Sequence, residues 1–170
     1  VHSHQDHAVA LARILTNAGI PVVVHALTDG RDTPPRSGVE FIGRLAADLP
    51  QGASIGTVIG RYFAMDRDQR WERTAAAVSA IVAGEGARAS SATAAIEAAY
   101  ARGESDEFVT PTVLLAAEGE DLVMRSSDTV IHANFRADRA RQLVAALSAK
   151  VFTAFTRPGQ LPVTLFGMSS

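Results

Sequence analysis

The run from Ile20 to Ser37, IPVVVHALTDGRDTPPRS, joins an apolar stretch to a turn that is rich in charged residues, glycine and proline. The nearly uninterrupted apolar part, Ile20–Leu27, is typical of a parallel strand that is covered on both faces. The loop Asp29–Ser37 would leave the carboxyl end of this strand, which is where ligands bind in open α/β sheets. This stretch therefore predicts both the kind of sheet and the edge at which a ligand would bind.

Two further junctions repeat this pattern of a strand followed by a loop that carries arginines. The expected strands are Ser54–Ile59 and Thr129–Asn134, with weaker signals at 112–116 and 161–166. The loops Gly60–Arg67 and Phe135–Arg139 follow the first two of these strands. Because strands alternate with helical patterns, the chain is predicted to be α/β, a single three-layer domain with a largely parallel sheet flanked by helices.

Apolar spacings of three and four residues predict the helices between these strands. The expected helices begin after His7, at Ser37, near Gln69, at Ser90 and near Asp138. Ile14 in the first helix and Phe41 in the second belong to these apolar faces. Ser37 and Glu40 have the spacing of a capping box, in which each side chain binds the backbone N–H of the other residue.

Composition limits the possible functions. The chain has 170 residues, of which 47% are hydrophobic and 20% charged, and its net charge is −2, as in an ordinary globular domain. A general nucleic-acid or membrane-surface role needs a strong positive field, so neither kind of partner is expected. There is no cysteine, which is compatible with the cytoplasm. The chain begins at Val1, and we expect it to be a piece of a longer protein.

The positions of the arginines carry more information than their number. Lys150 is the only lysine, and a GC-rich codon bias would explain most of the scattered arginines. Two pairs, however, are close to expected helix starts: Arg61 with Arg67, and Arg136 with Arg139. A helix N-terminus attracts anions and disfavours cations, so arginines placed there favour an anion site over solvated side chains. Guanidinium groups bind carboxylate and phosphate bidentately. The arginines that lie further into their helices, Arg73 and Arg141, are assigned to the surface.

The loop Asp29–Asp32 combines turn chemistry with two residues that a turn does not require. Asp29 and Gly30 favour the turn itself. Arg31 and Asp32 are not explained in this way, and a carboxylate beside a guanidinium suits proton transfer near a bound anion. The residues alone therefore predict a domain that clamps a small polyanion, such as a phosphorylated acid, with Asp32 available as an acid or base.

Two alternatives from other functional classes follow from the same residues. The chain could be a stand-alone binding module for small phosphorylated acids. It could also be a metal-dependent hydrolase that uses His2, His4 and His7. One short segment does not supply the fixed third ligand and outer partners that a zinc site needs, so no metal ligand is assigned and a substrate contact is favoured for the histidines.

Five motifs occur in order along the chain. They are VHSH at Val1–His4, DGRDTPP at Asp29–Pro35, GRYFAMDRD at Gly60–Asp68 with Arg70 and Trp71, DEF at Asp106–Phe108 with Pro111–Val113, and NFRADRARQ at Asn134–Gln142. Together they resemble the cofactor-independent (2,3-bisphosphoglycerate-independent) phosphoglycerate mutase family. The span from Lys150 to Pro162 matches only loosely, and family members usually continue further after the last strand.

The resemblance implies a division of the enzyme into two domains. In that family an alkaline-phosphatase-like domain carries two divalent metal ions, normally manganese, and a serine that is transiently phosphorylated. A second α/β domain grips the glycerate. Residues 1–170 resemble this second, substrate-binding (phosphotransferase) domain, with the catalytic metal and serine domain absent. We therefore expect no cofactor on this fragment and no mutase activity from it alone.

The resemblance also implies the residues and the reaction. The substrate-binding positions would be His2, Arg31, Asp32, Arg61, Arg67, Arg136 and Arg139. Asp32 would be the catalytic acid/base that exchanges protons with the glycerate hydroxyls. The full-length enzyme would interconvert 3-phosphoglycerate and 2-phosphoglycerate through a phosphoserine, in cytoplasmic glycolysis and gluconeogenesis.

Overall fold

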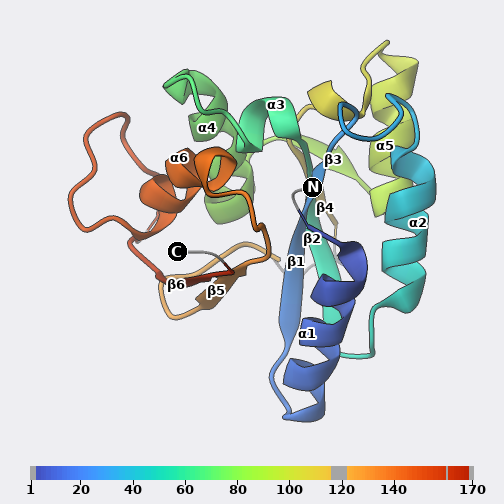
Figure 1. Ribbon diagram of the computed structural model, residues 1–170, viewed down its shortest axis with the longest axis horizontal. Coiled ribbons are helices and arrows are strands. Elements are labelled where there is room, and N and C mark those ends of the chain that lie inside the picture. The colour runs from blue at the N-terminus through green and yellow to red at the C-terminus, as the bar shows by residue number, and fades with distance from the viewer. Residues whose placement is uncertain (1–2, 116–121, 160, 169–170) are drawn as a thin grey trace.

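The chain folds around a four-stranded sheet with the strand order β1-β2-β4-β3, beside which lies a separate two-stranded sheet, β5-β6 (Figure 1). The computed structural model describes residues 3–115, 122–159 and 161–168. The strands are β1 Val22–Thr28, β2 Ala53–Gly60, β3 Ala87–Ala89, β4 Thr112–Leu114, β5 Thr129–His132 and β6 Thr164–Gly167. Pairs β1/β2, β3/β4 and β5/β6 are parallel, whereas β2/β4 is antiparallel.

Two apolar cores, one on each face of the central sheet, produce the three layers. The core that includes Ile42, Val58 and Ile96 joins this sheet to helices α1 (Gln5–Asn17), α2 (Gly38–Asp48) and α5 (Ala92–Ala101). The other core, which includes Ile59, Val78 and Leu143, joins it to helices α4 (Trp71–Val78) and α6 (Ala137–Ser148). Figure 1 shows α2 and α5 on one side of the sheet and α4 and α6 on the other. The predicted fold class, α/β with a mostly parallel sheet flanked by helices, is confirmed.

The helices agree with the expected positions and differ in their limits. They are α1 Gln5–Asn17, α2 Gly38–Asp48, α3 Arg61–Ala64, α4 Trp71–Val78, the π-helical η1 Ser79–Ala83, α5 Ala92–Ala101, the 3-10 turn η2 Asp106–Phe108, and α6 Ala137–Ser148. None of these helices in the described part of the chain is long and apolar enough to cross a membrane.

Strand β5 corrects one expectation, because it does not join the central sheet. It pairs with β6, with Ile131 opposite Phe166. Val130 and Leu165 pack against the core under α6, so the two strands cover that core. The strand expected at 161–166 begins only at Thr164.

The predicted capping box at the start of α2 is not formed. Ser37 has helical backbone angles and makes no capping hydrogen bond, and its hydroxyl donates to the Pro34 carbonyl at 2.9 Å. The backbone N–H groups of Ser37 and Gly38 donate to the Asp106 carboxylate, at 2.9 and 2.8 Å. A residue distant in the sequence therefore replaces the local cap.

Two side chains on the predicted apolar faces are exposed. Ile14 is 66% exposed, because α1 buries the face that carries Val9 and Ala12. Ile14 is five positions after Val9, which is about 140° around a helix. Phe41 is also exposed and lies at the margin of the α2 face that buries Ile42.

A histidine in β1, His25, is expected to make the stability of the fold depend on pH. The His25 Nδ1 atom lies 3.0 Å from the Thr57 hydroxyl. Burial lowers the pKa of His25 to about 4, against the opposing effect of the charge on Asp128. An unfolded histidine has a pKa near 6.5, so the unfolded chain takes up a proton at a higher pH than folded His25 does. The contribution of His25 to the free energy of unfolding is therefore complete above pH ~6.5 and is lost as the pH falls from ~6.5 to ~4. The loss should be on the order of 3 kcal/mol.

Urea unfolding of the chain between pH 7.5 and pH 4 measures this effect. His25→Asn keeps a group that can bind Thr57 and removes the titration, so its free energy of unfolding should depend less on pH in this window. His7→Asn removes an exposed histidine and should keep the wild-type pH dependence. Equal slopes for His25→Asn and the wild type would contradict the assignment.

Candidate functional site

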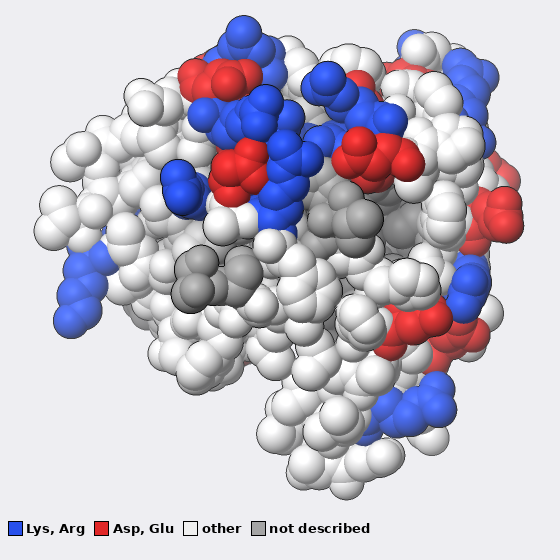
Figure 2. Space-filling model, in the orientation of Figure 1, with Lys and Arg blue, Asp and Glu red and all other residues white. Residues whose placement is uncertain are grey.

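The three arginine-bearing loops meet at one end of the molecule. Thr28 and Gly60 are paired at the ends of β1 and β2, so the loops after these strands begin side by side. The third loop joins the second through two hydrogen bonds: Arg67 Nη1 donates to Asp138 Oδ2 at 2.8 Å, and Arg139 Nη1 donates to the Met65 carbonyl at 3.1 Å. Figure 2 shows the resulting gathering of basic and acidic side chains.

The first loop has the turn that its sequence predicts. Asp29 Oδ1 accepts hydrogen bonds from the backbone N–H groups of Arg31 and Asp32, at 3.0 and 3.1 Å. Gly30 has a φ of +71°, which glycine adopts readily. The side chains of Arg31 and Asp32 are exposed at the tip of the loop. A ligand can therefore reach both of them.

The buried side chain of Arg61 connects the first loop to the second loop. Its side chain is only 5% exposed, and its Nη1 atom lies 2.5 Å from Asp29 Oδ1 and 3.2 Å from Asp32 Oδ2. Burial alone would lower the pKa of Arg61, but these two carboxylates raise it above the ordinary value. Burial alone would raise the pKa of Asp29, but hydrogen bonds from Asp32, Arg61 and Arg31 outweigh this effect and lower the pKa below its ordinary value. Arg61 thus holds two carboxylates in place.

Arg67 and Arg136 share the carboxylate of Asp138. The Arg136 Nε atom lies 2.9 Å from Asp138 Oδ1, and Arg67 binds the other oxygen. Hydrogen bonds from Arg136 and then from Arg67 lower the pKa of Asp138 to about 2. Arg67 is 45% exposed and Arg136 is 40% exposed, so both guanidinium groups also face solvent. Asp138 keeps them side by side, which reduces the entropy lost when they bind an anion.

Arg139 completes the cluster of cations. Its Nε atom is buried and has no hydrogen-bond partner among the described residues. Burial lowers the pKa of Arg139, and the positive charges of Arg67, Arg61 and Arg136 lower it further. Four arginines from two loops therefore lie within electrostatic range of one another. Such a concentration of positive charge favours an anionic ligand.

The buried carboxylate of Asp66 supports the second loop, a role that no sequence pattern indicated. It accepts hydrogen bonds from the backbone N–H groups of Asp68 and Arg70 and from the Gln142 amide, at 3.1, 3.0 and 2.9 Å. Arg73, which we assigned to the surface, is largely buried, with its guanidinium 3.7 Å from the centroid of the Tyr62 ring. Arg73 is the third residue of α4, and the neighbouring sequence gave no indication of this contact.

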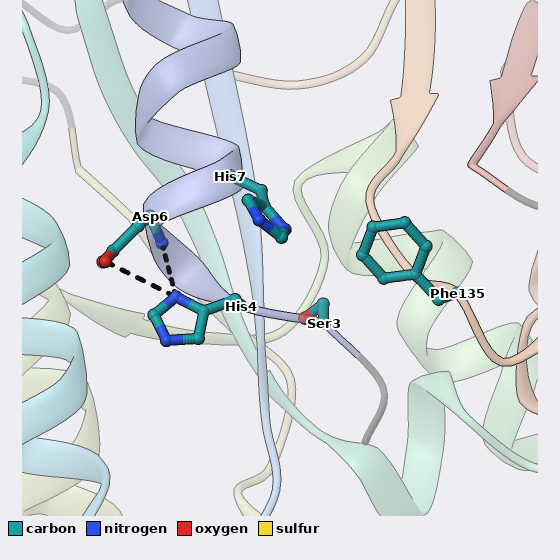
Figure 3. A pocket seen from close by; sticks show the side chains of 5 residues that line it. All are labelled: Ser3, His4, Asp6, His7 and Phe135. Atoms are coloured by element: carbon teal, nitrogen blue, oxygen red, sulfur yellow. Dashed lines mark hydrogen bonds and ion pairs between the residues drawn. The ribbon is translucent and has the colours of Figure 1, made fainter.

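His4 and His7 lie beside the third loop. A pocket of about 420 Å³ is lined by Ser3, His4, Asp6, His7 and Phe135 (Figure 3). The ring of His7 meets that of Phe135 edge to face, with the centroids 5.8 Å apart. His2 falls outside the described residues. Within residues 3–115, 122–159 and 161–168, no three His, Asp or Glu side chains are grouped so that they could hold a metal ion.

Comparison with known proteins gives a consistent result. Residues 1–170 match the family model described as "BPG-independent PGAM N-terminus". The 2,3-bisphosphoglycerate-independent phosphoglycerate mutase of Dinoroseobacter shibae is 52% identical over 162 residues, which cover 95% of this chain and 31% of that protein. The enzyme of the same name from Paracoccus denitrificans is 50% identical over 155 residues, covering 91% of this chain and 30% of that protein.

A solved structure agrees with these relatives. The phosphoglycerate mutase of Leishmania mexicana, determined at low cobalt concentration, superimposes with a TM-score of 0.91 at 29% identity. The superposition covers 99% of this chain and 33% of that chain. The present chain thus spans about a third of the length of the proteins that it matches.

Proposed function

Because this chain belongs to the family of BPG-independent phosphoglycerate mutase N-termini, we propose that residues 1–170 form the substrate-binding domain of such an enzyme. The full-length protein would interconvert 3-phosphoglycerate and 2-phosphoglycerate, in cytoplasmic glycolysis and gluconeogenesis. The observation that carries the proposal is the meeting of Arg61, Arg67, Arg136 and Arg139 beside the exposed carboxylate of Asp32.

The charges of the cluster suit the proposed substrate. Phosphoglycerate carries a phosphate and a carboxylate, and a guanidinium group can bind either of them through two parallel hydrogen bonds. Arg31, Arg67 and Arg136 reach solvent and can make such contacts directly. Arg61 would contribute mainly by holding Asp29 and Asp32. Arg139 would contribute its charge and an Nε–H that has no partner among the described residues.

Asp32 would act as the acid and base of the reaction. When the phosphoryl group leaves the 3-hydroxyl oxygen of the substrate for a serine, that oxygen needs a proton. When the phosphoryl group returns to the 2-hydroxyl oxygen, that hydroxyl loses its proton. A carboxylate that is exposed at a loop tip and aligned by Arg61 can serve both steps.

The remaining two thirds of the enzyme would supply the rest of the chemistry. We infer that it holds the serine that becomes phosphorylated and two divalent ions, manganese or similar. The arginine cluster would keep glycerate bound between the two transfers, which is catalysis by positioning and charge neutralisation. Closure of the two domains on the substrate would exclude the water that could hydrolyse the phosphoserine.

An activity assay tests this proposal against the two alternatives, in which the 170-residue chain is a stand-alone binding module or a metal-dependent hydrolase. We expect no conversion of 3-phosphoglycerate to 2-phosphoglycerate by the chain in a coupled enolase assay, and full activity from the full-length protein. Soaking crystals of the full-length protein with 3-phosphoglycerate should place its charged groups against Arg31, Arg67 and Arg136. Turnover by the isolated chain, or substrate bound away from the three loops, would contradict the proposal.

A further inference from the structure

The segment Asp106–Val109 lies against the backbones of both the first and the second loop. A Cβ atom added to Gly30 would lie 2.6 Å from the Glu107 nitrogen and 2.9 Å from the Asp106 Cβ atom. One added to Gly60 would overlap the Glu107 carbonyl, and the Gly60 N–H donates to the Val109 carbonyl at 2.8 Å. The two loops are therefore placed relative to each other by direct backbone contact with this segment.

Asp106 binds the first loop at both of its ends. Its carbonyl accepts a hydrogen bond from the Thr28 hydroxyl at 2.6 Å, where the loop begins. Its backbone N–H donates to the Pro35 carbonyl at 2.9 Å, and its carboxylate accepts from Ser37 and Gly38, where the loop ends. One residue thus fixes the start and the end of the segment that carries Arg31 and Asp32.

The start of helix α2 requires a buried hydrogen-bond acceptor. Helix α2 begins at Gly38, and its first N–H groups have no partner within the helix. A negative charge at a helix N-terminus is favourable, and the Asp106 side chain, which is 1% exposed, supplies it. The Tyr100 hydroxyl donates to Asp106 Oδ1 at 2.5 Å. Burial and the neighbouring Asp106 raise the pKa of Tyr100 to about 12, so this hydroxyl stays a donor at neutral pH.

We propose that Asp106 is a positioning residue for the transfer reaction. It holds the loop tip that carries Arg31 and Asp32 in a fixed position relative to the arginine cluster, which consists of Arg61, Arg67, Arg136 and Arg139. The proposal rests on the function proposed above. Asp106 lies under the loop and does not meet the substrate. Its neighbour Glu107 adds to the effect, because Glu107 Oε1 lies 3.7 Å from Arg31 Nη1.

The full-length enzyme with Asp106→Ala tests this inference. We expect kcat to fall about 10- to 100-fold, since displacement of a reacting group by about 1 Å costs rates of this order. KM for 3-phosphoglycerate should change by less than about three-fold, because Arg67 and Arg136 are held by Asp138 and not by Asp106. Asp106→Asn keeps an oxygen for Ser37 and Gly38 and should restore kcat to within about five-fold of the wild type. Glu104→Gln, a nearby change that touches neither loop, should leave both parameters unchanged.

A double-mutant cycle separates positioning from general damage to the fold. If Asp106 acts through Asp32, then Asp106→Ala should lower kcat by less than about three-fold in an Asp32→Asn background. The same fold loss in both backgrounds, or a wild-type kcat for Asp106→Ala, would overturn the inference. Wild-type activity of Asp32→Asn would instead overturn the proposed function.

A second variant decides the matter if Asp106→Ala does not fold. Tyr100→Phe removes only a hydroxyl, which donates to Asp106 and accepts from the Gly38 N–H at 3.2 Å, and we expect a three- to ten-fold lower kcat with unchanged KM. An unchanged kcat for a folded Tyr100→Phe enzyme would then overturn the inference.

Discussion

Asp32→Asn in the full-length enzyme is expected to lower kcat by about 100- to 1,000-fold, while KM for 3-phosphoglycerate changes by less than about three-fold. The amide oxygen can still accept the hydrogen bond from Arg61, 3.2 Å away, so the loop tip should keep its place. The amide cannot exchange a proton with a glycerate hydroxyl. The loss should therefore fall on the chemical step and spare binding.

Steady-state kinetics with a coupled enolase assay measures this prediction, and a second carboxylate provides the control. Asp48 lies exposed at the end of α2 and pairs with Arg44. Asp48→Asn should leave kcat and KM at wild-type values. If Asp32→Asn keeps a kcat within two-fold of the wild type, Asp32 is not the acid or base.

Arg136→Ala is expected to lower kcat/KM by about 100- to 1,000-fold with little loss of stability. The guanidinium of Arg136 is 40% exposed and directed to the same carboxylate as Arg67, so its removal leaves Asp138 with one charged partner and opens no cavity in the core. The melting temperature should shift by less than about 2 °C, as for other exposed substitutions. Arg136→Lys keeps the charge without the bidentate geometry and should recover only part of the loss.

Arg141 gives a matched control on the same helix. It is exposed, and we assign it no role in the site. Arg141→Ala should leave kinetics and melting temperature unchanged. Equal effects of the two substitutions would show a general dependence on net charge, and unchanged kinetics of Arg136→Ala would remove that arginine from the site.

Local sequence patterns predicted much of this molecule. The apolar run before Asp29 and the similar run before Gly60 became paired parallel strands, because an apolar run between turn residues is a local signal of a strand. The expected burial on both faces holds for the last six residues of β2, whereas Val23 in the edge strand β1 is 40% exposed. The turn at Asp29 and Gly30 also followed from nearby residues alone, since an aspartate side chain binds backbone N–H groups two and three residues ahead. Features of this kind depend on neighbours in the chain.

The tertiary structure decided which charged groups face a ligand. Arg61 and Arg67 are in one loop, yet the first is buried between two carboxylates and the second reaches solvent. Helix α2 takes its cap from Asp106, 69 residues beyond Ser37, and the local Ser37–Glu40 spacing was misleading. The charged side chains of arginine and aspartate pair with opposite charges that lie near them in space. Burial then fixes the pairing, because an unpaired buried charge is costly. For this reason the sequence indicated where the arginines gather, whereas only packing determined which of them support the site and which are open to a substrate.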